Sequence, residues 1–513
     1  MKKKTNRILT LLISGLVMGG SLSTVFVYAA NKDASKYKEL DVQVDDTDFK
    51  DINEVDGAVL SDLKIGVVTD VHISAKNDGK QSLHLGDATK RFKETLKYYK
   101  RNGVDTIMLT GDFVNYGVAE DYALFVNCLE EVFGTPENAP DLIPVYGNHE
   151  GYVYKDTENK TGVGVTTSAA QYALMKEYVQ PWTSMTIYNG KEGAEAVGSP
   201  VSYVVKDDVY ILSLPTGWND ASFARLDSVL AEASNASDKP IVVGLHYSLN
   251  PDLYAGLDGA TSTYISEENY NKLVSILAKY PKAVVFSGHE HATALHERAI
   301  SQDLGYTNVV AAVSNIMGFQ SHPTGTPAGV RYDNYISSHE SILEEDGLGV
   351  WGRYNFCSLG QVLTFDEDSM NIQIVNLKEN RTYTDLGWEI PYGITLENKA
   401  EKFAYVNSVR KTQQAELTFK QGAKVELSLR FGKLCVAFPS VQEYRKVEGY
   451  KIVIQKEGQD DIVLYWHSNF IKYPESIVTY QVQVNSETST DGYTVSVYPI
   501  DMYGNVSSPI TNA

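Results

Sequence analysis

The sequence predicts an α/β domain followed by a smaller all-β domain, and two observations support this prediction. From residue 63, short apolar runs alternate with helical patterns, which is typical of a sheet covered by helices. After Tyr405, short alternating runs follow one another without a convincing helix, and turn residues separate them at the spacing of a β-sandwich. A chain of 513 residues, 43% of them hydrophobic, is long enough to form both domains.

The N-terminus has the three regions of an export signal. A basic segment (Lys2, Lys3, Lys4 and Arg7) precedes an apolar stretch from Ile8 to Val27, and cleavage after Ala29 is expected. Residues 1–29 are therefore predicted to be a cleaved signal peptide, and the protein is expected to be secreted or at the cell surface. An uncleaved membrane anchor is the alternative, because the apolar stretch approaches the ~20 residues that span a bilayer.

The α/β domain is predicted to cover residues 61–378. The polar, acidic residues 30–60 before it are expected to form a linker or an edge strand. A helix is expected where Phe92, Leu96 and Tyr99 share a face, with Gly103 at its C-terminal cap, and another from Asp220 to Ala233. Strands are expected at Leu63–Val68, Thr106–Leu109, Leu142–Val145, Val209–Leu214, Ile241–Leu245 and Ala283–Phe286.

The second domain is predicted to cover residues 406–513, after a linker at 379–405. Its end, Tyr493 to Ser507, resembles the last strands of fibronectin type III modules. Because its strand pattern is self-contained, truncation near residue 400 is expected to leave the first domain folded and functional. Its strands are expected at Lys424–Leu429, Leu434–Phe438, Tyr450–Gln455, Ile462–Trp466, Val478–Val484 and Tyr493–Tyr498.

Charge and cysteine content exclude some classes. The formal net charge is -20, which argues against a nucleic-acid backbone as the main partner. Cys128, Cys357 and Cys435 are far apart and show no metal-ligand spacing, so neither a disulfide framework nor a zinc knuckle is expected. A bridge between one pair of these cysteines stays open.

Five of the predicted strands lead into polar motifs. Because ligands bind beyond the carboxyl ends of strands in α/β sheets, these motifs are expected to meet at one place. In chain order they are Asp70-Val71-His72, Gly111-Asp112, Gly147-Asn148-His149-Glu150, His246 and Gly288-His289-Glu290-His291.

The residue types in these motifs indicate a metal centre. The candidate ligands comprise two aspartates, one asparagine and four histidines, which suit Mn, Fe, Zn, Co or Ni better than Ca or Mg. They are too many for one tetrahedral ion, and a shared carboxylate would divide them into two sets. The glycines at 111, 147 and 288 allow tight turns and close approach of the backbone to a bound group.

In this order, the five motifs resemble those of the calcineurin-like metallophosphoesterase superfamily, over residues 63 to about 375. The resemblance implies a β-sandwich core flanked by helices. It also implies hydrolysis of a small phosphomonoester or phosphodiester by a metal-bridged hydroxide, with two divalent transition-metal ions (Mn, Fe or Zn) as cofactors. Two such ions, ~3.5–4 Å apart, can clamp a phosphoryl group and activate a water molecule.

The resemblance also implies roles for individual residues. Asp70, His72 and His291 would hold the first metal, Asn148, His246 and His289 the second, and Asp112 would bridge them. His149 would protonate the leaving group as a general acid, and Glu150 would orient that region.

Departures from particular relatives narrow the expected activity. The Ser/Thr phosphatases of the superfamily carry G-D-x-V-D-R-G, whereas this chain has Asn115 and Tyr116 at the Asp and Arg positions, so a phosphoprotein phosphatase is disfavoured. Asn115 is expected to hydrogen-bond His149, but it would not raise the pKa of the imidazole as a carboxylate would. His72 and Asn115 disfavour a purple acid phosphatase, and Gly151-Tyr152 after the motif disfavours a 5'-nucleotidase.

The remaining candidates are weaker. Tyr152, Tyr154 and His322 are candidates to contact a substrate. The other histidines, namely His84, His296, His339 and His467, are expected to be surface or supporting residues. The rival hypothesis is a surface-binding protein whose β-sandwich contacts glycan or protein and whose metallophosphoesterase domain is a non-catalytic scaffold. The complete ligand set argues against this rival.

Overall fold

The computed structural model describes residues 49–50, 63–76, 88–156, 158, 161–165, 168–188, 200–249, 265–289, 291, 293–312, 359–377, 381–430, 432–468, 479–486 and 488–512. The expected signal peptide (1–29), Cys357 and His322 lie outside these residues. Within the described part of the chain, no helix is long and apolar enough to cross a membrane.

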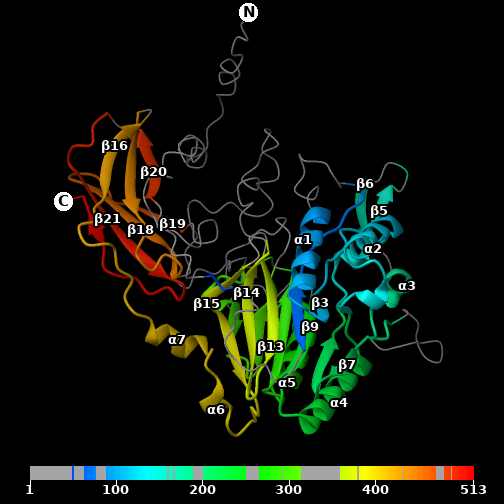
Figure 1. Cartoon of the computed structure of the whole chain (residues 1–513). Helices are drawn as coiled ribbons and strands as arrows, with labels where there is room; N and C mark the ends of the chain where they lie inside the picture. Colours follow the sequence, from blue (N-terminus) through cyan, green and yellow to red (C-terminus); the bar gives the residue numbers. More distant parts are fainter. Residues whose placement is uncertain are drawn as a thin grey trace, which may run out of the picture.

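Two β-sheets form the centre of the larger domain (Figure 1). Within each sheet, the strands that precede the candidate ligands run parallel to one another. The first sheet has the order β1 (Phe49–Lys50), β15 (Arg381–Pro391), β14 (Ser369–Asn376), β13 (Leu359–Phe365), β2 (Lys64–Val68), β3 (Thr106–Leu109), β4 (Asp141–Pro144). The second has the order β11 (Ile300–Ser301), β12 (Thr307–Val310), β10 (Ala283–Gly288), β9 (Ile241–Tyr247), β8 (Val209–Ser213), β7 (Ser202–Lys206).

The two sheets share a hydrophobic core. Val67 and Met108 of the first sheet and Val242 and Phe286 of the second lie in one buried cluster. Helices cover the outer faces, which gives four layers in the order α/β/β/α. These helices are α1 (Ala88–Arg101), α2 (Ala119–Phe133) and α3 (Ser168–Val179) over the first sheet, and α4 (Asp220–Ala236) and α5 (Glu267–Leu277) over the second.

The two predicted helices are both present. In α1 the predicted face is buried, and Gly103 follows the helix with a φ of 66°, a conformation that glycine adopts without strain. Helix α4 begins after Asn219, whose side chain accepts a hydrogen bond from the Ser222 N–H at 2.9 Å. The six strands predicted for this domain also form, as β2, β3, β4, β8, β9 and β10.

The boundary of the first domain differs from the prediction. Strand β15 lies inside the predicted linker 379–405 and pairs with β14, so the first sheet extends to Pro391. Its apolar side chains are interrupted by charged ones and by Gly387, because the strand lies near an edge of the sheet and one face is exposed. Strand β1 covers that edge and pairs Phe49 with Tyr383. An edge strand was one of the two alternatives predicted for residues 30–60.

Two further sheets pack around their own core in the C-terminal domain. Val436 and Phe438 of one sheet pack against Ile452 and Val497 of the other, which is consistent with the predicted all-β domain. Its likeness to fibronectin type III modules stays a prediction. The sheets are β16 (Glu426–Arg430), β17 (Lys433–Pro439) and β20 (Thr479–Ser486), and β19 (Ile462–His467), β18 (Val447–Lys456), β21 (Tyr493–Asp501) and β22 (Ile510–Thr511). Cys435 and Cys128 are buried in different domains and therefore do not bridge to each other.

The expectation of no helix after Tyr405 is wrong. Helix α7 (Asn407–Gln413) follows α6 (Lys399–Lys402) in the connection between the domains. Its sequence has no apolar periodicity, and contacts with the first domain hold it instead. The Asn407 N–H donates to Asp303 Oδ2 at 3.0 Å, and Arg410 Nη1 donates to the Glu297 carbonyl at 2.9 Å.

A buried polar contact joins the two domains. His296 Nε2 lies 2.7 Å from Glu448 Oε2 of β18, and Arg298 Nη2 lies 3.9 Å from the same oxygen. The side chains of His296 and Glu448 are 1% and 0% exposed. Met502 and Tyr503 pack into a buried cluster with residues of β13, β14 and β15 beside this contact.

The domain contact carries a testable consequence. Glu448→Ala leaves buried His296 and Arg298 without their carboxylate, and breaking a buried pair costs about 3–5 kcal/mol of unfolding free energy. We expect a loss of this size in urea unfolding followed by tryptophan fluorescence. The control is Glu457→Ala in the exposed turn after β18, expected within about 0.5 kcal/mol of wild type. Equal stability of the two variants would show that the contact is not stabilising. The same contact leads us to expect that truncation near residue 400 also lowers stability.

Candidate metal centre

The five motifs lie where their strands end. Strands β2, β3 and β4 are parallel in one sheet, and β9 and β10 are parallel in the other, so their carboxyl ends share one edge of the sandwich. The structure brings the candidate ligands together there. They are Asp70, His72, Asp112, Asn148, His246, His289 and His291.

The first ligand set consists of Asp70, His72 and His291. Asp70 Oδ1 lies 3.1 Å from His291 Nε2, and the Nε2 atoms of His72 and His291 are 3.3 Å apart. The other oxygen, Asp70 Oδ2, accepts hydrogen bonds from Thr69 Oγ1 at 2.8 Å and from the His289 N–H at 3.0 Å. These donors fix the carboxylate so that Oδ1 faces the two imidazoles.

The second set consists of Asn148, His246 and His289. His246 Nδ1 lies 2.9 Å from the Thr110 carbonyl and therefore donates its proton there, which leaves Nε2 as the free lone pair of the neutral ring. This Nε2 lies 2.9 Å from Asn148 Oδ1. The same amide oxygen lies 2.9 Å from His289 Nδ1.

Asp112 stands between the two sets. Its Oδ2 lies 3.2 Å from His246 Nε2 of the second set and 4.0 Å from His72 Nε2 of the first. Its Oδ1 faces away and accepts the His149 N–H at 2.8 Å. One carboxylate oxygen therefore faces both sets, as a bridging ligand requires.

The donor chemistry fits cations. Lone pairs of Asn148 Oδ1, Asp112 Oδ2 and His246 Nε2 point at one another, and they repel unless a proton or a cation lies between them. Burial lowers the pKa of His246, but the carboxylate of Asp112 outweighs it and raises the pKa to about 9. Burial raises the pKa of Asp112, but His246 and other histidines outweigh it and lower the pKa well below its usual range. A metal ion bound here would compete with a proton for the Nε2 lone pair of His246.

Glu150 joins two of the ligand loops. It is fully buried, and its Oε2 accepts the Asp112 N–H at 2.9 Å and the Gly147 N–H at 2.7 Å. Its Oε1 accepts the Val114 N–H at 3.1 Å. Burial, together with the Asp112 carboxylate, raises its pKa to about 8. Glu150 therefore sets the backbone that carries the bridging ligand, which gives the predicted orienting role a geometric basis.

Two glycines make room for this geometry. A Cβ atom at Gly147 would overlap Asp112 Oδ1 and press on Glu150 Oε2. At Gly288 it would overlap Thr69 Oγ1 and press on Asp70 Oδ2. Larger residues at either position would displace a ligand carboxylate, so these glycines are needed for the packing of the candidate ligands themselves.

The backbone of the centre is strained. Seven described non-glycine residues have a positive φ, and five of them are candidate ligands. Such left-handed conformations cost about 1–2 kcal/mol each for ordinary residues and less for aspartate and histidine. Strained backbone conformations of this kind are concentrated at functional sites, where the surrounding structure holds them in place. The five ligands and their φ values are Asp70 (51°), His72 (53°), Asp112 (52°), His289 (70°) and His291 (50°).

The imidazole of His149 lies beside the candidate ligands and is partly exposed to solvent. Its side chain is 24% exposed, and its Nε2 lies 3.9 Å from Asp112 Oδ2. Its Nδ1 lies 2.9 Å from the main-chain carbonyl of Asn115 and donates to it. The expected contact with Asn115 is therefore made by the backbone, so it does not depend on the side chain at position 115.

The two tyrosines after the motif differ in position. Strand β5 (Tyr152–Asp156) pairs with β6 (Thr161–Val165), and Tyr154 packs against Tyr116 with ring centroids 4.3 Å apart. Tyr154 is 7% exposed and is not available to a substrate. Tyr152 is half-buried, and its ring lies 4.7 Å from that of His149.

Sequence reasoning missed Asp121, which also shapes the site. It is fully buried at the start of α2, and it accepts the Ala75 N–H at 2.8 Å and the Tyr116 N–H at 3.0 Å. It thereby ties the loop after β2 to the loop after β3. An acidic residue in the first turn of a helix is the only sequence signal for it, and that signal is common.

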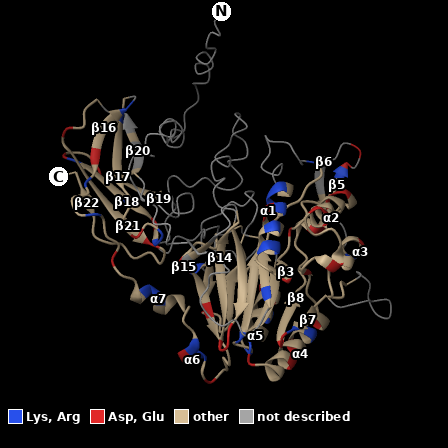
Figure 2. Ribbon diagram, viewed as in Figure 1, with Lys and Arg blue, Asp and Glu red and all other residues tan. Residues whose placement is uncertain are grey.

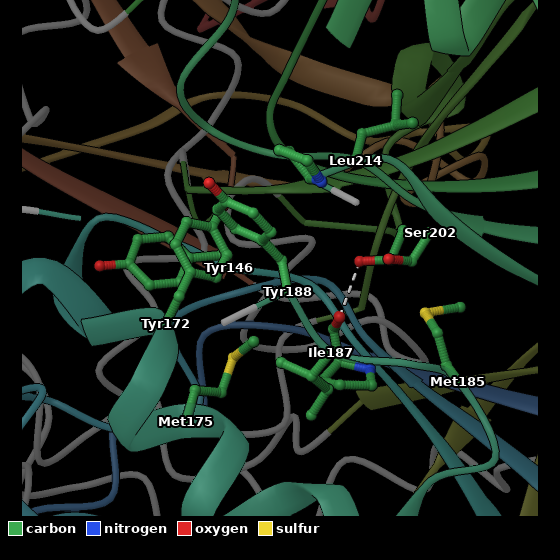
Figure 3. Close-up of a pocket in the computed structure, with 11 residues that line it drawn as sticks. Tyr146, Tyr172, Met175, Met185, Ile187, Tyr188, Ser202 and Leu214 are labelled. Atoms are coloured by element: carbon green, nitrogen blue, oxygen red, sulfur yellow. Dashed lines mark hydrogen bonds between the residues drawn. The ribbon is translucent and has the colours of Figure 1, made fainter. Parts of the chain in front are cut away.

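A cavity lies beside the centre but contains none of the candidate ligands (Figure 3). It is lined mainly by aromatic and apolar side chains. Tyr146, which precedes the ligand loop, stacks on Tyr172 of α3 with ring centroids 4.3 Å apart. The ring of Tyr188 packs edge-on against Tyr172, with centroids 5.1 Å apart. The cavity therefore belongs to the packing that supports Tyr146 and Gly147.

Basic residues are frequent along α1, and acidic ones are spread over other elements (Figure 2). Lys93 pairs with Glu131 at 2.8 Å, and Lys100 donates to the Val132 carbonyl at 2.7 Å. This is the pattern of a solvated helix face.

Comparison with known proteins identifies the larger domain. Residues 63–293 match the family of calcineurin-like phosphoesterases, so the chain contains a calcineurin-like metallophosphoesterase domain. No curated protein matches the sequence. Among solved structures, a dimetal phosphatase from Danio rerio is similar at 12% identity, covering 64% of this chain and 99% of its own, with a TM-score of 0.34. The M60 catalytic domain of Clostridium perfringens ZmpC, solved with the sialyl T antigen, is similar at 19% identity over 19% of this chain and 16% of its own, with a TM-score of 0.12. Neither likeness bears on function at these TM-scores.

Proposed function

We propose that this metallophosphoesterase domain makes the protein an exported enzyme that hydrolyses small phosphomonoesters or phosphodiesters. The observation that carries the proposal is the convergence of seven side chains that can each donate a lone pair to a metal. They form two sets, and Asp112 Oδ2 lies between these sets. Such a donor set suits two divalent transition-metal ions, with Mn, Fe or Zn as candidates. Asp70, His72 and His291 would hold one ion, and Asn148, His246 and His289 the other.

When bound, two such ions stabilise the charge of a transferring phosphoryl group and lower the pKa of water to ~7. The protein's own residues supply orientation and a proton. Glu150 and the loop glycines hold Asp112 in place, as described above. His149 is fixed by the Asn115 carbonyl at Nδ1, so its Nε2 is the atom that gives a proton to the departing oxygen.

The rival hypothesis is a surface-binding protein with a non-catalytic metallophosphoesterase scaffold. The complete ligand set argues against it, because a site without activity has no need of strained ligand backbones and a fitted bridging carboxylate. Export through residues 1–29, and contact of residues 406–513 with cell-surface glycan or protein, stay predictions.

Metal analysis and a substrate panel test the proposal together. Protein purified without chelator should approach two ions per chain. It should hydrolyse some members of a panel of phosphomonoesters and phosphodiesters in the presence of Mn²⁺, and chelation should abolish this activity. A well-folded chain that never holds more than one ion under metal excess contradicts the dinuclear assignment. A chain that holds two ions and cleaves no ester supports the rival.

A further inference from the structure

We infer that Tyr152 is a positioning residue for the second metal: its hydroxyl holds the Asn148 amide with the oxygen turned toward the metal position. The inference rests on the proposed function, since it concerns the same centre. Asn148 Nδ2 donates a hydrogen bond to the Tyr152 hydroxyl at 3.1 Å. At its other end, Asn148 Oδ1 lies 2.9 Å from both His246 Nε2 and His289 Nδ1.

Asn148 differs from the other candidate ligands because its two ends are chemically unlike. The amide oxygen carries lone pairs that bind a cation, and the amide NH₂ has none to offer. A half-turn about the last side-chain bond would present NH₂ to the cation and abolish coordination. An acceptor that satisfies Nδ2 in the ligating orientation therefore stabilises the metal-bound state, and the Tyr152 hydroxyl is that acceptor.

The hydroxyl of Tyr152 is held in place from several sides. Tyr152 and Asn148 flank a single turn of 3-10 helix, His149–Gly151. The Tyr152 carbonyl accepts the Gly117 N–H at 2.8 Å, and β5 pairs Tyr152 with Val165. The ring packs 4.7 Å from that of His149. The main chain of Tyr152 and its ring are thus held by contacts other than the hydrogen bond with Asn148.

The size of the effect follows from the exposure of Asn148. Loss of an outer partner of a metal ligand lowers metal affinity by about 10–100-fold. Asn148 is half-buried, so water can replace part of the lost hydrogen bond. For Tyr152→Phe we therefore expect the lower end of that range, about 10-fold, at one of the two metal sites.

Calorimetric titration of the metal-free, full-length chain with Mn²⁺ tests the inference. Tyr152→Phe should weaken one site about 10-fold and leave the other unchanged. Tyr154→Phe is the matched control, because it removes a hydroxyl from the same face of β5 without touching Asn148. It should bind both ions as wild type does. The unfolding temperature of metal-free Tyr152→Phe should stay at the wild-type value, which separates positioning from a general structural role.

Asn148→Asp gives a second, independent readout. A carboxylate has two oxygen ends and no orientation to lose, so Tyr152→Phe should have a much smaller effect on Mn²⁺ affinity in this background. Wild-type affinity at both sites in Tyr152→Phe, or an undiminished effect beside Asn148→Asp, overturns this inference alone. A wild-type chain that holds fewer than two ions overturns the proposed function and this inference with it.

Discussion

Asp112→Ala is expected to lose both metal ions and activity on every substrate. Its Oδ2 is the atom that faces both ligand sets, so its removal takes one ligand from each ion. Metal clamping contributes several kcal/mol to phosphoryl transfer, and each ~1.4 kcal/mol is a factor of ten in rate, so turnover should fall about 10³-fold or more. Metal content after gel filtration and kcat on a mono- and a diester measure the two losses.

Asp112→Asn is the matched control for this substitution. Asparagine adopts the left-handed backbone found at position 112 and keeps an acceptor for the His149 N–H, whereas alanine loses both advantages. If bridging by charge is the role of Asp112, both variants lose metal, and Asp112→Asn keeps the unfolding temperature of the metal-free wild type. Two tightly held ions in Asp112→Ala would contradict the bridging assignment.

His149→Ala is expected to lower turnover on alkyl phosphate esters by about 10²–10⁴-fold, the usual size of general acid catalysis. An alkoxide leaving group is strongly basic and needs a proton, whereas a nitrophenolate is already stable near neutral pH. The loss on p-nitrophenyl esters should therefore be much smaller. Comparing kcat for the two ester types with one variant measures proton donation without a second mutation.

Metal content decides what a different result would mean. His149 Nε2 lies 3.9 Å from Asp112 Oδ2, near enough to be considered as a ligand, yet its proposed role leaves the metals in place. Near-wild-type metal content with an equal loss on both ester types would assign His149 to positioning the phosphate. Loss of one ion in His149→Ala would make it a ligand and would remove it as the general acid.

The parts of the molecule that were predictable from sequence are those with a local signal. The apolar runs before Asp70, Asp112 and His246 became β2, β3 and β9, because a buried strand is a short apolar run and little else. The convergence of the candidate ligands followed from parallel strands ending at one edge. The buried face of α1 followed from the spacing of its aromatic residues.

The parts that were missed depend on tertiary contacts. Strand β15 was missed because its half-exposed sequence reads as a linker until its pairing with β14 is known. Helix α7 has no apolar stripe and is held by contacts of Asn407 and Arg410 with the first domain. His296 was expected as a surface or supporting residue, and it is instead buried against Glu448. No local pattern distinguishes such a histidine from an exposed one.

The left-handed ligands have a consequence for locating similar centres. Among the described residues, the positive-φ non-glycine positions outside the centre are only Asp207 and Asp208, in the turn between β7 and β8. A scan of backbone dihedral angles that leaves out the glycines would therefore find this centre. It would even separate the centre from the turn, because the five ligand positions come from distant parts of the chain and cluster in space, whereas the turn positions are adjacent in sequence.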